Sequence, residues 1–425
     1  MRRSGMCAVV VTMVLTSAVV TPAAASGPGV IRVSVSTAGT QANSFSHSTA
    51  VSAGCRYIAF TSYATNLAVG DTDGLPGGVF VRDRRTGTTQ RVSVSSSGAD
   101  ALDESGGPQI SGDGRYVSFT SGAANLAPRD TNGAEDAFVH DRRTRRTQRI
   151  SVSAAGVQGN GWSLAGPLSA DGRYVVFSSF ATNLVRGDTN GEEDVFVRDQ
   201  RTGTISRVSV SHTGAQASQA AGDATISADG RYVAFLSTAE HLVPGDTNDE
   251  ADVFVRDRLA GTTRRVNVTP AGRQADRSTF QAAISGNGRY VVFSSYATTL
   301  VPGDTNDTSD VFVRDLGTGD LSRVSVSARG EQATLGSDGA VISADGRHIA
   351  FRSQAANLAP GTFDGDDRIF VRDRRLGTIR VGPPAAWYSP LSIGDNGRCV
   401  AFASGAPNLV PDDTNEAADV FLYRY

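Results

Sequence analysis

The feature that most constrains the fold is a unit of about 58 residues, which the 425-residue chain repeats seven times. Each unit centres on an arginine that follows a tight turn, and a phenylalanine comes four residues after it. The arginines are Arg56, Arg115, Arg173, Arg231, Arg289, Arg347 and Arg398, at steps of 59, 58, 58, 58, 58 and 51 residues. Self-similarity at such a period predicts a repeat architecture such as a propeller or a solenoid.

Each unit contains four short segments that carry the signals of β-strands. In the fourth unit we predict these segments at residues 224–227, 231–236, 252–257 and 263–268, and we name them strands A to D. They are bounded by Gly, Asp and Asn, and no segment after residue 30 has a helical period. Four antiparallel strands repeated radially predict an all-β fold, a seven-bladed β-propeller over residues 30–425.

The first and last units differ from the others in a complementary way. The last unit stops at residues 421–425, which we assign to strand C, and so it lacks a strand D. An additional strand at residues 31–35 precedes the first unit, and its sequence matches Arg91-Val92-Ser93-Val94 of a strand D. We therefore expect the N-terminal strand to complete the seventh blade and to close the ring.

The repeat also resembles a known family. Ser227-Ala228-Asp229-Gly230-Arg231-Tyr232, followed by an apolar strand and by Val253-Phe254-Val255-Arg256-Asp257, resembles the TolB-like, WD-repeat-like propeller repeat. That repeat typically reads S-P-D-G-K, an apolar strand and I-Y-V-x-D. The likeness covers about residues 30–425 and implies a propeller fold. The chain lacks the Pro, has a longer B–C loop and lacks the separate N-terminal domain of TolB, so a role in envelope transport is not implied.

The start of the chain has the pattern of a secretory leader. Residues 1–3 are basic, residues 7–20 form an apolar run of 14 residues, and small residues follow at 22–26. We predict a signal peptide over residues 1–25, cleaved after Ala25, and a secreted or extracytoplasmic protein. The alternative is an uncleaved membrane anchor, although the apolar run is short for a membrane span.

The charge of the chain excludes one class of partner. The net charge is −3 at pH 7, and the basic residues form no stripe. Nucleic acid is therefore not an expected partner. We expect a monomer with no stable membrane insertion after cleavage of the leader.

Two cysteines, Cys55 and Cys399, follow the leader. Cys55 replaces the turn glycine of blade 1, and Cys399 replaces the tyrosine that opens strand B of blade 7. These blades are neighbours once the ring is closed, and disulfides form in oxidising compartments. We expect a disulfide between them; the alternative is two buried free thiols at unrelated positions.

The loop between strands B and C carries an acidic motif, Asp-Thr-Asn with a second Asp four residues after the Asn. The complete copies are Asp130, Asn132 and Asp136; Asp188, Asn190 and Asp194; Asp246, Asn248 and Asp252; Asp304, Asn306 and Asp310; and Asp413, Asn415 and Asp419. Oxygen ligands at short spacing are typical of calcium loops, although the closing Glu of an EF-hand is missing. The alternative is a loop held by Asx turns. Five-fold repetition indicates a structural role for the motif, as it does for the turn arginines, which we expect to pair with acids or cap carbonyls.

The connections from strand D to the next strand A differ between units. They contain the candidate binding residues Trp162, Trp387, Tyr388, Phe280, Arg277, Asp103 and Glu104. Aromatic side chains on variable loops over a rigid scaffold indicate a recognition surface. The alternative is that Trp162 and Trp387 only fill gaps between blades.

These patterns favour a non-catalytic module that requires no cofactor and binds a protein, a peptide or a glycan on the face of the D–A connections. A secreted polysaccharide hydrolase or lyase with acids such as Asp103 and Glu104 in the channel mouth is one alternative. A calcium-stiffened structural protein is another. The five histidines fall at unrelated positions, and no G-x-S-x-G motif is present.

Overall fold

The strands of the chain are arranged as seven four-stranded antiparallel sheets. The structure is a computed structural model that describes residues 29–68, 77–361, 365, 367–386 and 389–425. Blade 1 contains β2 (Ser46–Val51), β3 (Tyr57–Ser62), β4 (Gly78–Asp83) and β5 (Thr88–Arg91); blade 2 contains β6 (Ser105–Ile110), β7 (Tyr116–Ser121), β8 (Asp136–Asp141) and β9 (Arg146–Arg149); blade 3 contains β10 (Ser163–Leu168), β11 (Tyr174–Ser179), β12 (Asp194–Asp199) and β13 (Ile205–Arg207); blade 4 contains β14 (Ala221–Ile226), β15 (Tyr232–Ser237), β16 (Asp252–Asp257) and β17 (Thr262–Arg265). Blade 5 contains β18 (Thr279–Ile284), β19 (Tyr290–Ser295), β20 (Asp310–Asp315) and β21 (Leu321–Arg323); blade 6 contains β22 (Ser337–Ile342), β23 (His348–Ser353), β24 (Arg368–Asp373) and β25 (Thr378–Pro384); blade 7 contains β26 (Ser392–Ile393), β27 (Cys399–Ser404), β28 (Asp419–Arg424) and β1 (Gly29–Arg32). None of the described residues forms a helix that is long and apolar enough to cross a membrane.

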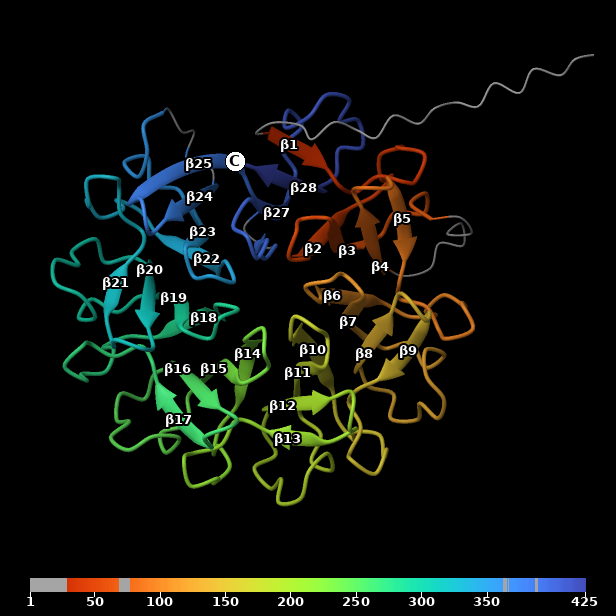
Figure 1. Cartoon of the computed structure of the whole chain (residues 1–425), viewed down its shortest axis with the longest axis horizontal. Helices are drawn as coiled ribbons and strands as arrows, with labels where there is room; N and C mark the ends of the chain where they lie inside the picture. Colours follow the sequence, from red (N-terminus) through yellow and green to blue (C-terminus); the bar gives the residue numbers. More distant parts are fainter. Residues whose placement is uncertain (1–28, 69–76, 362–364, 366, 387–388) are drawn as a thin grey trace, which may run out of the picture.

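The sheets stand around a central axis, with strand A of each blade innermost (Figure 1). β1 pairs with β28, and Val30 lies opposite Tyr423. The N-terminal strand therefore completes blade 7, as the sequence predicts. This pairing closes the ring and ties the two ends of the described chain into one sheet.

The core lies between neighbouring blades and is built from the same residues each time. The phenylalanines of strands B and C stack across every blade, with ring centroids 5.5–5.9 Å apart. In blade 4 these are Phe235 and Phe254, and both are completely buried. Burial of one such side chain contributes about 1.5–3 kcal/mol, so the repeated pair is a main source of blade stability.

One end of the ring, named here the A–B face, carries the A–B turns and the C–D hairpins. Neighbouring A–B turns are joined by backbone hydrogen bonds. In each bond an N–H donates to a carbonyl oxygen at 2.8–3.1 Å. The pairs, with the donor first, are Ala53 and Gly112, Gly112 and Ala170, Ala170 and Ala228, Ala228 and Gly286, Asn287 and Ala344, and Ala344 and Asp395. Small residues at these positions let the turns approach closely: a Cβ on Gly286 would lie 2.7 Å from the Cβ of Ala344. The bonds hold the blades together around the axis.

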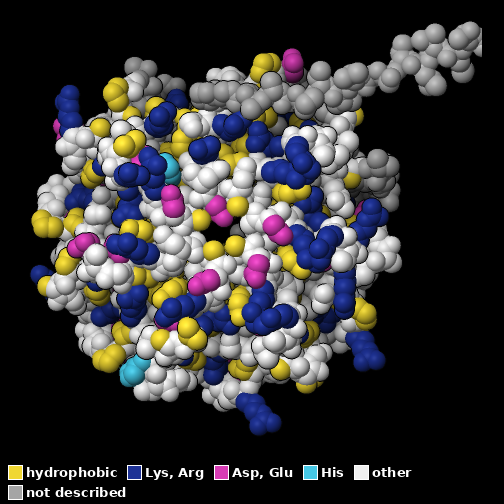
Figure 2. All heavy atoms as spheres, in the orientation of Figure 1, with side chains coloured by type: hydrophobic (Ala, Val, Ile, Leu, Met, Phe, Trp, Pro, Cys, Tyr) yellow, Lys and Arg dark blue, Asp and Glu magenta, His cyan; other side chains and the backbone are white. Residues whose placement is uncertain are grey.

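Figure 2 shows one face of the ring, on which Asp and Glu side chains surround a central opening and arginines lie farther out. The A–B turns produce this arrangement, because the Asp of the turn precedes an arginine whose side chain reaches to the end of strand C. In six blades this arginine pairs with an Asp at 2.6–2.7 Å. The hydrogen bond from Arg231 holds the pKa of Asp257 at about 2. The expectation that the turn arginines pair with acids is confirmed in these blades.

The predicted strand boundaries in blade 4 need correction for strands A, B and D. Strand A is β14, which starts at Ala221 rather than at residue 224, and strand B is shifted by one residue. Strand D is β17, which ends at Arg265 rather than at residue 268. The ladder ends there because the side chain of Asn267 replaces a backbone acceptor and receives the N–H of Val253 at 3.1 Å. The N-terminal strand ends early for the same reason: Ser34 Oγ accepts the N–H of Val420 at 3.1 Å.

The predicted disulfide between Cys55 and Cys399 is formed, with the two Cα atoms 6.4 Å apart. Cys55 has a φ of 58°, the left-handed conformation that glycine adopts in the same turn of the other blades. The disulfide links blade 1 to blade 7 beside the closure. Its two half-cystines are 344 residues apart in the sequence.

Candidate binding face

The opposite end of the ring, named here the D–A face, carries the D–A connections and the B–C loops. Most of the large hydrophobic side chains that are exposed within the described ranges lie on this face. They are Tyr63, Leu102, Trp162, Leu164, Phe180, Tyr296 and Leu335. On the A–B face the exposed residues of this kind are Leu259 and Leu376, at the C–D hairpins. Exposed apolar side chains that gather on one face of a rigid scaffold mark an interaction surface.

The predicted binding residues that the structure describes all lie on the D–A face, but on three separate blades. Asp103 and Glu104 precede β6 in blade 2, and both are exposed. Trp162 precedes β10 in blade 3 and is 62% exposed, so it does not fill a gap between blades. Arg277 and Phe280 belong to blade 5, and Arg277 pairs with Asp307 at 2.6 Å. Trp387 and Tyr388 lie outside the described residues.

Blade 1 presents a stack of rings on this face. The ring centroids of Phe45 and His47 are 4.9 Å apart, and His47 lies 6.1 Å from Tyr63 in a nearly parallel arrangement. The hydroxyl of Tyr63 donates to a carboxylate oxygen of Glu104 in the next blade. This hydrogen bond raises the pKa of Tyr63 to about 12, while burial lowers the pKa of His47. A neutral histidine and a protonated tyrosine make this an uncharged aromatic surface bordered by one carboxylate.

Blade 5 presents a second ring pair. The centroids of Phe280 and Tyr296 are 5.0 Å apart. Ser278, which lies between Arg277 and β18, donates its hydroxyl to a carboxylate oxygen of Glu250 in the preceding blade. As in blade 1, an aromatic pair lies beside a glutamate that a hydroxyl group holds in place.

Blade 3 has bulky side chains in the same places. The N–H of Phe180 donates to the carbonyl of Trp162 at 3.0 Å, which ties the B–C loop to the D–A connection. Leu164 pairs with Ser178 across the sheet, and Ser178 donates its hydroxyl to Glu193. Burial and, to a smaller extent, the charge of Asp223 raise the pKa of Glu193. Glu193 and Asp223 thus place two carboxyl groups beside the innermost strand of blade 4.

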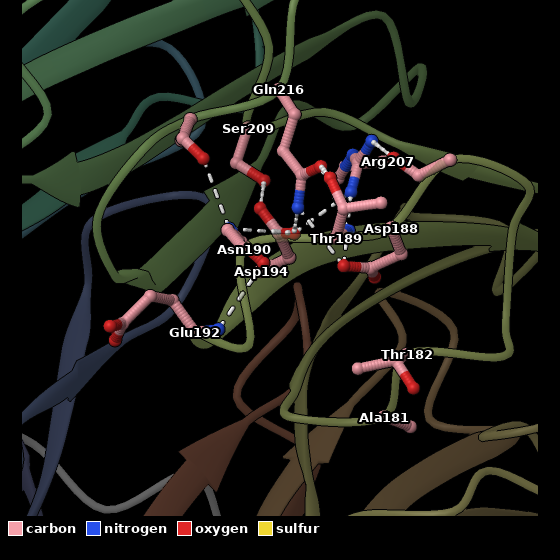
Figure 3. Close-up of polar contacts among 12 residues, drawn as sticks. Ala181, Thr182, Asp188, Thr189, Asn190, Glu192, Asp194, Arg207, Ser209 and Gln216 are labelled. Atoms are coloured by element: carbon pink, nitrogen blue, oxygen red, sulfur yellow. Dashed lines mark hydrogen bonds and ion pairs between the residues drawn. The ribbon is translucent and has the colours of Figure 1, made fainter.

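The Asp-Thr-Asn loops, predicted as calcium loops or as Asx turns, are organised around an arginine from strand D (Figure 3). In blade 3 Arg207 lies 3.3 Å from Asp188 and 3.0 Å from Asp194. Gln216 donates to the same two carboxylates at 3.0 and 3.1 Å. Asn190 accepts the N–H of residue 192 at 3.2 Å, the contact expected of an Asx turn.

The other complete copies use an arginine in the same way. The groups are Arg149 with Asp130 and Asp136, Arg265 with Asp246 and Asp252, Arg323 with Asp304 and Asp310, and Arg32 with Asp413 and Asp419, with nitrogen–oxygen distances of 2.6–3.9 Å. Within the described ranges no three His, Cys, Asp or Glu side chains are grouped as metal ligands. Since the guanidinium already contacts both carboxylates and offsets one of their two negative charges, a calcium ion would have to displace it. Calcium binding by these loops therefore stays a prediction, tested below.

Sequence analysis missed Tyr63, Phe180 and Tyr296 as site residues. All three follow strand B directly, at steps of 117 and 116 residues, which is the length of two units. The signal was present in the sequence, but it appears only when alternate units are compared. The arginine of strand D was also missed as the partner of the acidic loops. It lies 13 residues after the second Asp in four of the complete copies, and in the fifth it is Arg32, 387 residues before Asp419.

No protein-family model matches the chain, and no curated protein matches it. Among solved structures, an oligogalacturonate lyase in complex with manganese is similar at a TM-score of 0.57 and 13% identity, covering 94% of each chain. The β-propeller domain of the Trilobed protease from Pyrococcus furiosus, which has an open velcro topology, is similar at 0.56 and 9% identity, covering 89% of this chain and 95% of that one. TolB from Acinetobacter baumannii matches at 0.42 and 13% identity, covering 82% and 76%.

These comparisons concern the fold. They place the chain among propellers, in agreement with the propeller fold that the predicted repeat implies. At identities of 9–13% they do not transfer an activity or a ligand. Unlike the open velcro of the Trilobed protease domain, the ring of this chain is closed by β1 on β28.

Proposed function

We propose that the protein is an exported, non-catalytic propeller that binds a partner on its D–A face. The observation that carries this proposal is the gathering of exposed aromatic side chains there, at positions that change from blade to blade. The core and the turns, in contrast, repeat. Export is supported by the leader pattern of residues 1–25 and by the disulfide between Cys55 and Cys399, which suits an oxidising compartment.

The test is capture of glycans and proteins by the immobilised mature chain. Trp162→Ala combined with Phe180→Ala removes two side chains that are 62% and 47% exposed. The matched control is Leu259→Ala, which removes a 79% exposed side chain from the A–B face. We expect the double variant to lose capture and the control to keep it. Equal capture by all three proteins would refute the proposal.

A second candidate is a hydrolase or lyase acting on a polysaccharide in the channel mouth. The observation that favours it is the pair Glu193 and Asp223. Burial and, to a smaller extent, the charge of Asp223 raise the pKa of Glu193, and a carboxyl group with a raised pKa can act as a general acid. Release of reducing ends from the polysaccharide that the protein captures, and its loss in Glu193→Gln, would support this candidate.

A further inference from the structure

The D–A face repeats with a period of two blades rather than one. The residue after strand B is aromatic in blades 1, 3 and 5, where it is Tyr63, Phe180 and Tyr296; in blades 2, 4 and 6 it is Gly122, Thr238 and Gln354. The second residue of strand A follows the same rule: it is His47, Leu164 and Phe280 in blades 1, 3 and 5, and Gly106, Gly222 and Asp338 in blades 2, 4 and 6. At these two positions bulky side chains therefore alternate with Gly, Thr, Gln or Asp from blade 1 to blade 6.

The same period appears independently at the blade interfaces. In the even blades an arginine follows strand C and lies over the strand B tyrosine of the preceding blade. Arg142 lies over Tyr57, Arg258 over Tyr174 and Arg374 over Tyr290, with 4.2–4.6 Å between the guanidinium carbon and the ring centroid. In blades 3 and 5 the residues at this position are Gln200 and Leu316. In blade 1 it is Arg84, but the preceding blade has Cys399 in place of the tyrosine, and Arg84 donates to the carbonyl of Cys55 at 2.7 Å. Blades 1 to 6 thus form three two-blade units, and the bulky side chains of blades 1, 3 and 5 lie at corresponding positions.

We define three aromatic clusters on the D–A face. Cluster 1 contains Phe45, His47 and Tyr63; cluster 3 contains Trp162, Leu164 and Phe180; and cluster 5 contains Phe280 and Tyr296. One carboxylate, held by a hydroxyl group, accompanies each cluster: Glu104 by Tyr63, Glu193 by Ser178 and Glu250 by Ser278. Each cluster therefore offers an apolar ring surface beside an anionic hydrogen-bond acceptor.

From this arrangement we infer that the three clusters are similar subsites for one repeating ligand, a polysaccharide of uncharged sugars. This inference rests on the proposed function and names its ligand class. A sugar ring has a face of C–H groups that stacks on an aromatic side chain, and hydroxyl groups at its rim donate to carboxylates. The carboxylates repel an acidic polysaccharide, so the charge of the clusters selects an uncharged one.

Repetition of the clusters favours a polymer over a protein epitope. A polysaccharide presents the same unit many times, whereas a folded protein surface presents a given epitope once. When a long chain occupies several clusters, later contacts are intramolecular, and the total affinity exceeds that of one cluster by about 10²–10⁴. The three clusters need not touch one another for this gain; the ligand only has to span them.

The experiment uses the mature chain with cellulose, xylan, galactomannan and chitin, and with polygalacturonate as an acidic control. The polysaccharide that binds is then compared with its own hexasaccharide by calorimetric titration. We expect three hexasaccharides per protein, and two after Tyr63→Ala, Phe180→Ala or Tyr296→Ala. For the long polymer we expect each single variant to bind about 10- to 100-fold more weakly. Leu259→Ala on the A–B face should bind like the wild type.

The unfolding midpoint in urea shows that each variant is folded. The conservative variant Tyr63→Phe, which keeps the ring, should retain three hexasaccharide sites. A stoichiometry of one, complete loss of binding in one single variant, or preference for polygalacturonate would overturn the inference. If no polysaccharide binds but Trp162→Ala with Phe180→Ala abolishes capture of a protein, the inference fails while the proposed function stands. If capture does not depend on the D–A face at all, both fail.

Discussion

The A–B face and the D–A face are the two ends of the same strands, and they use repetition differently. At the A–B face the turn, its backbone hydrogen bonds and the arginine–aspartate pair recur in nearly every blade. At the D–A face the residue after strand B and the second residue of strand A alternate in kind from blade 1 to blade 6, and the loops differ in detail. A residue that recurs in every blade serves the ring, so the residues that break the one-blade repeat are the candidates for binding.

The comparison predicts that changes at the A–B face lower stability and leave binding intact. The largest effect is expected for Cys55→Ser with Cys399→Ser, which removes the link between blades 1 and 7. Loss of a disulfide that closes a long loop costs about 2–5 kcal/mol of the free energy of unfolding. Urea unfolding at equilibrium measures this loss, and an unchanged free energy of unfolding would show that β1 on β28 closes the ring alone.

The next largest effect is expected for Arg115→Ala. This change removes a 2.6 Å ion pair with Asp141 and the guanidinium 4.5 Å above Tyr116. Hydrogen bonds to charged groups contribute about 1.5–3 kcal/mol, so we expect a destabilisation of this size. Arg56→Ala in blade 1 should cost the same, because its contacts are the same. Phe180→Ala, an exposed site on the D–A face, should stay within about 0.5 kcal/mol of the wild type. If the two variants lose different amounts of the free energy of unfolding, the turns of blades 1 and 2 are not equivalent.

We also expect the ionisable groups at the two ends to change the stability of the fold in opposite directions as the pH falls. At the A–B face the pKa values of Asp199, Asp257 and Asp315 are about 2, held there by the paired arginines. These carboxylates stabilise the fold fully above about pH 3.9, the pKa of Asp in the unfolded chain, and their contribution is lost as the pH falls towards 2. Behind the D–A face, burial and the neighbouring Asp252 raise the pKa of Asp246 to about 6. Protonation there favours the folded state, so this group adds stability as the pH falls from 6 to about 4.

Urea unfolding at pH 7, 5 and 2 separates these two terms. We expect the free energy of unfolding to be higher at pH 5 than at pH 7 and lowest at pH 2. Asp246→Asn should reduce the gain between pH 7 and pH 5 and leave the loss at pH 2 unchanged. If the free energy of unfolding of this variant rises as much between pH 7 and pH 5 as that of the wild type, another group causes the rise.

A smaller effect is expected for Gln200→Arg. Arg258 of blade 4 lies over Tyr174 of blade 3. An arginine at position 200 of blade 3 would lie over Tyr116 of blade 2 in the same way. A cation–π contact at a partly exposed site contributes about 0.5–1 kcal/mol, and the variant should be more stable by that amount. The reverse change, Arg258→Gln, should cost a similar amount. Destabilisation by Gln200→Arg would mean that the interfaces of odd and even blades differ in more than this residue.

The smallest effect is expected for removal of divalent cations. An arginine already contacts both carboxylates of each complete Asp-Thr-Asn loop, so EDTA should leave the melting temperature unchanged. A lower melting temperature that calcium restores would show that an ion replaces the guanidinium, as the sequence motif alone allowed.

The fold could be predicted from the sequence because its signals are local and repeated. Similar copies of the turn before Arg231 and of the strands that contain Phe235 and Phe254 recur along the chain. The N-terminal strand, in turn, matches the D strands of other units. The site could be predicted only in part. Trp162 is an exposed aromatic residue as proposed, but Tyr63 and Tyr296 directly follow ordinary strands and nothing local distinguishes them. The partner of the acidic loops was missed because Arg207 comes from another strand.

Binding at the D–A face is best tested by hydrogen exchange of the protein, measured with and without a saturating amount of the captured ligand. We expect slower exchange at residues 45–48, 63–65, 162–165, 180–183 and 278–281, all on the D–A face of blades 1, 3 and 5. Exchange at the A–B turns, such as residues 112–114 and 228–230, should not change. Protection confined to the A–B turns, or spread equally over odd and even blades, would contradict this expectation.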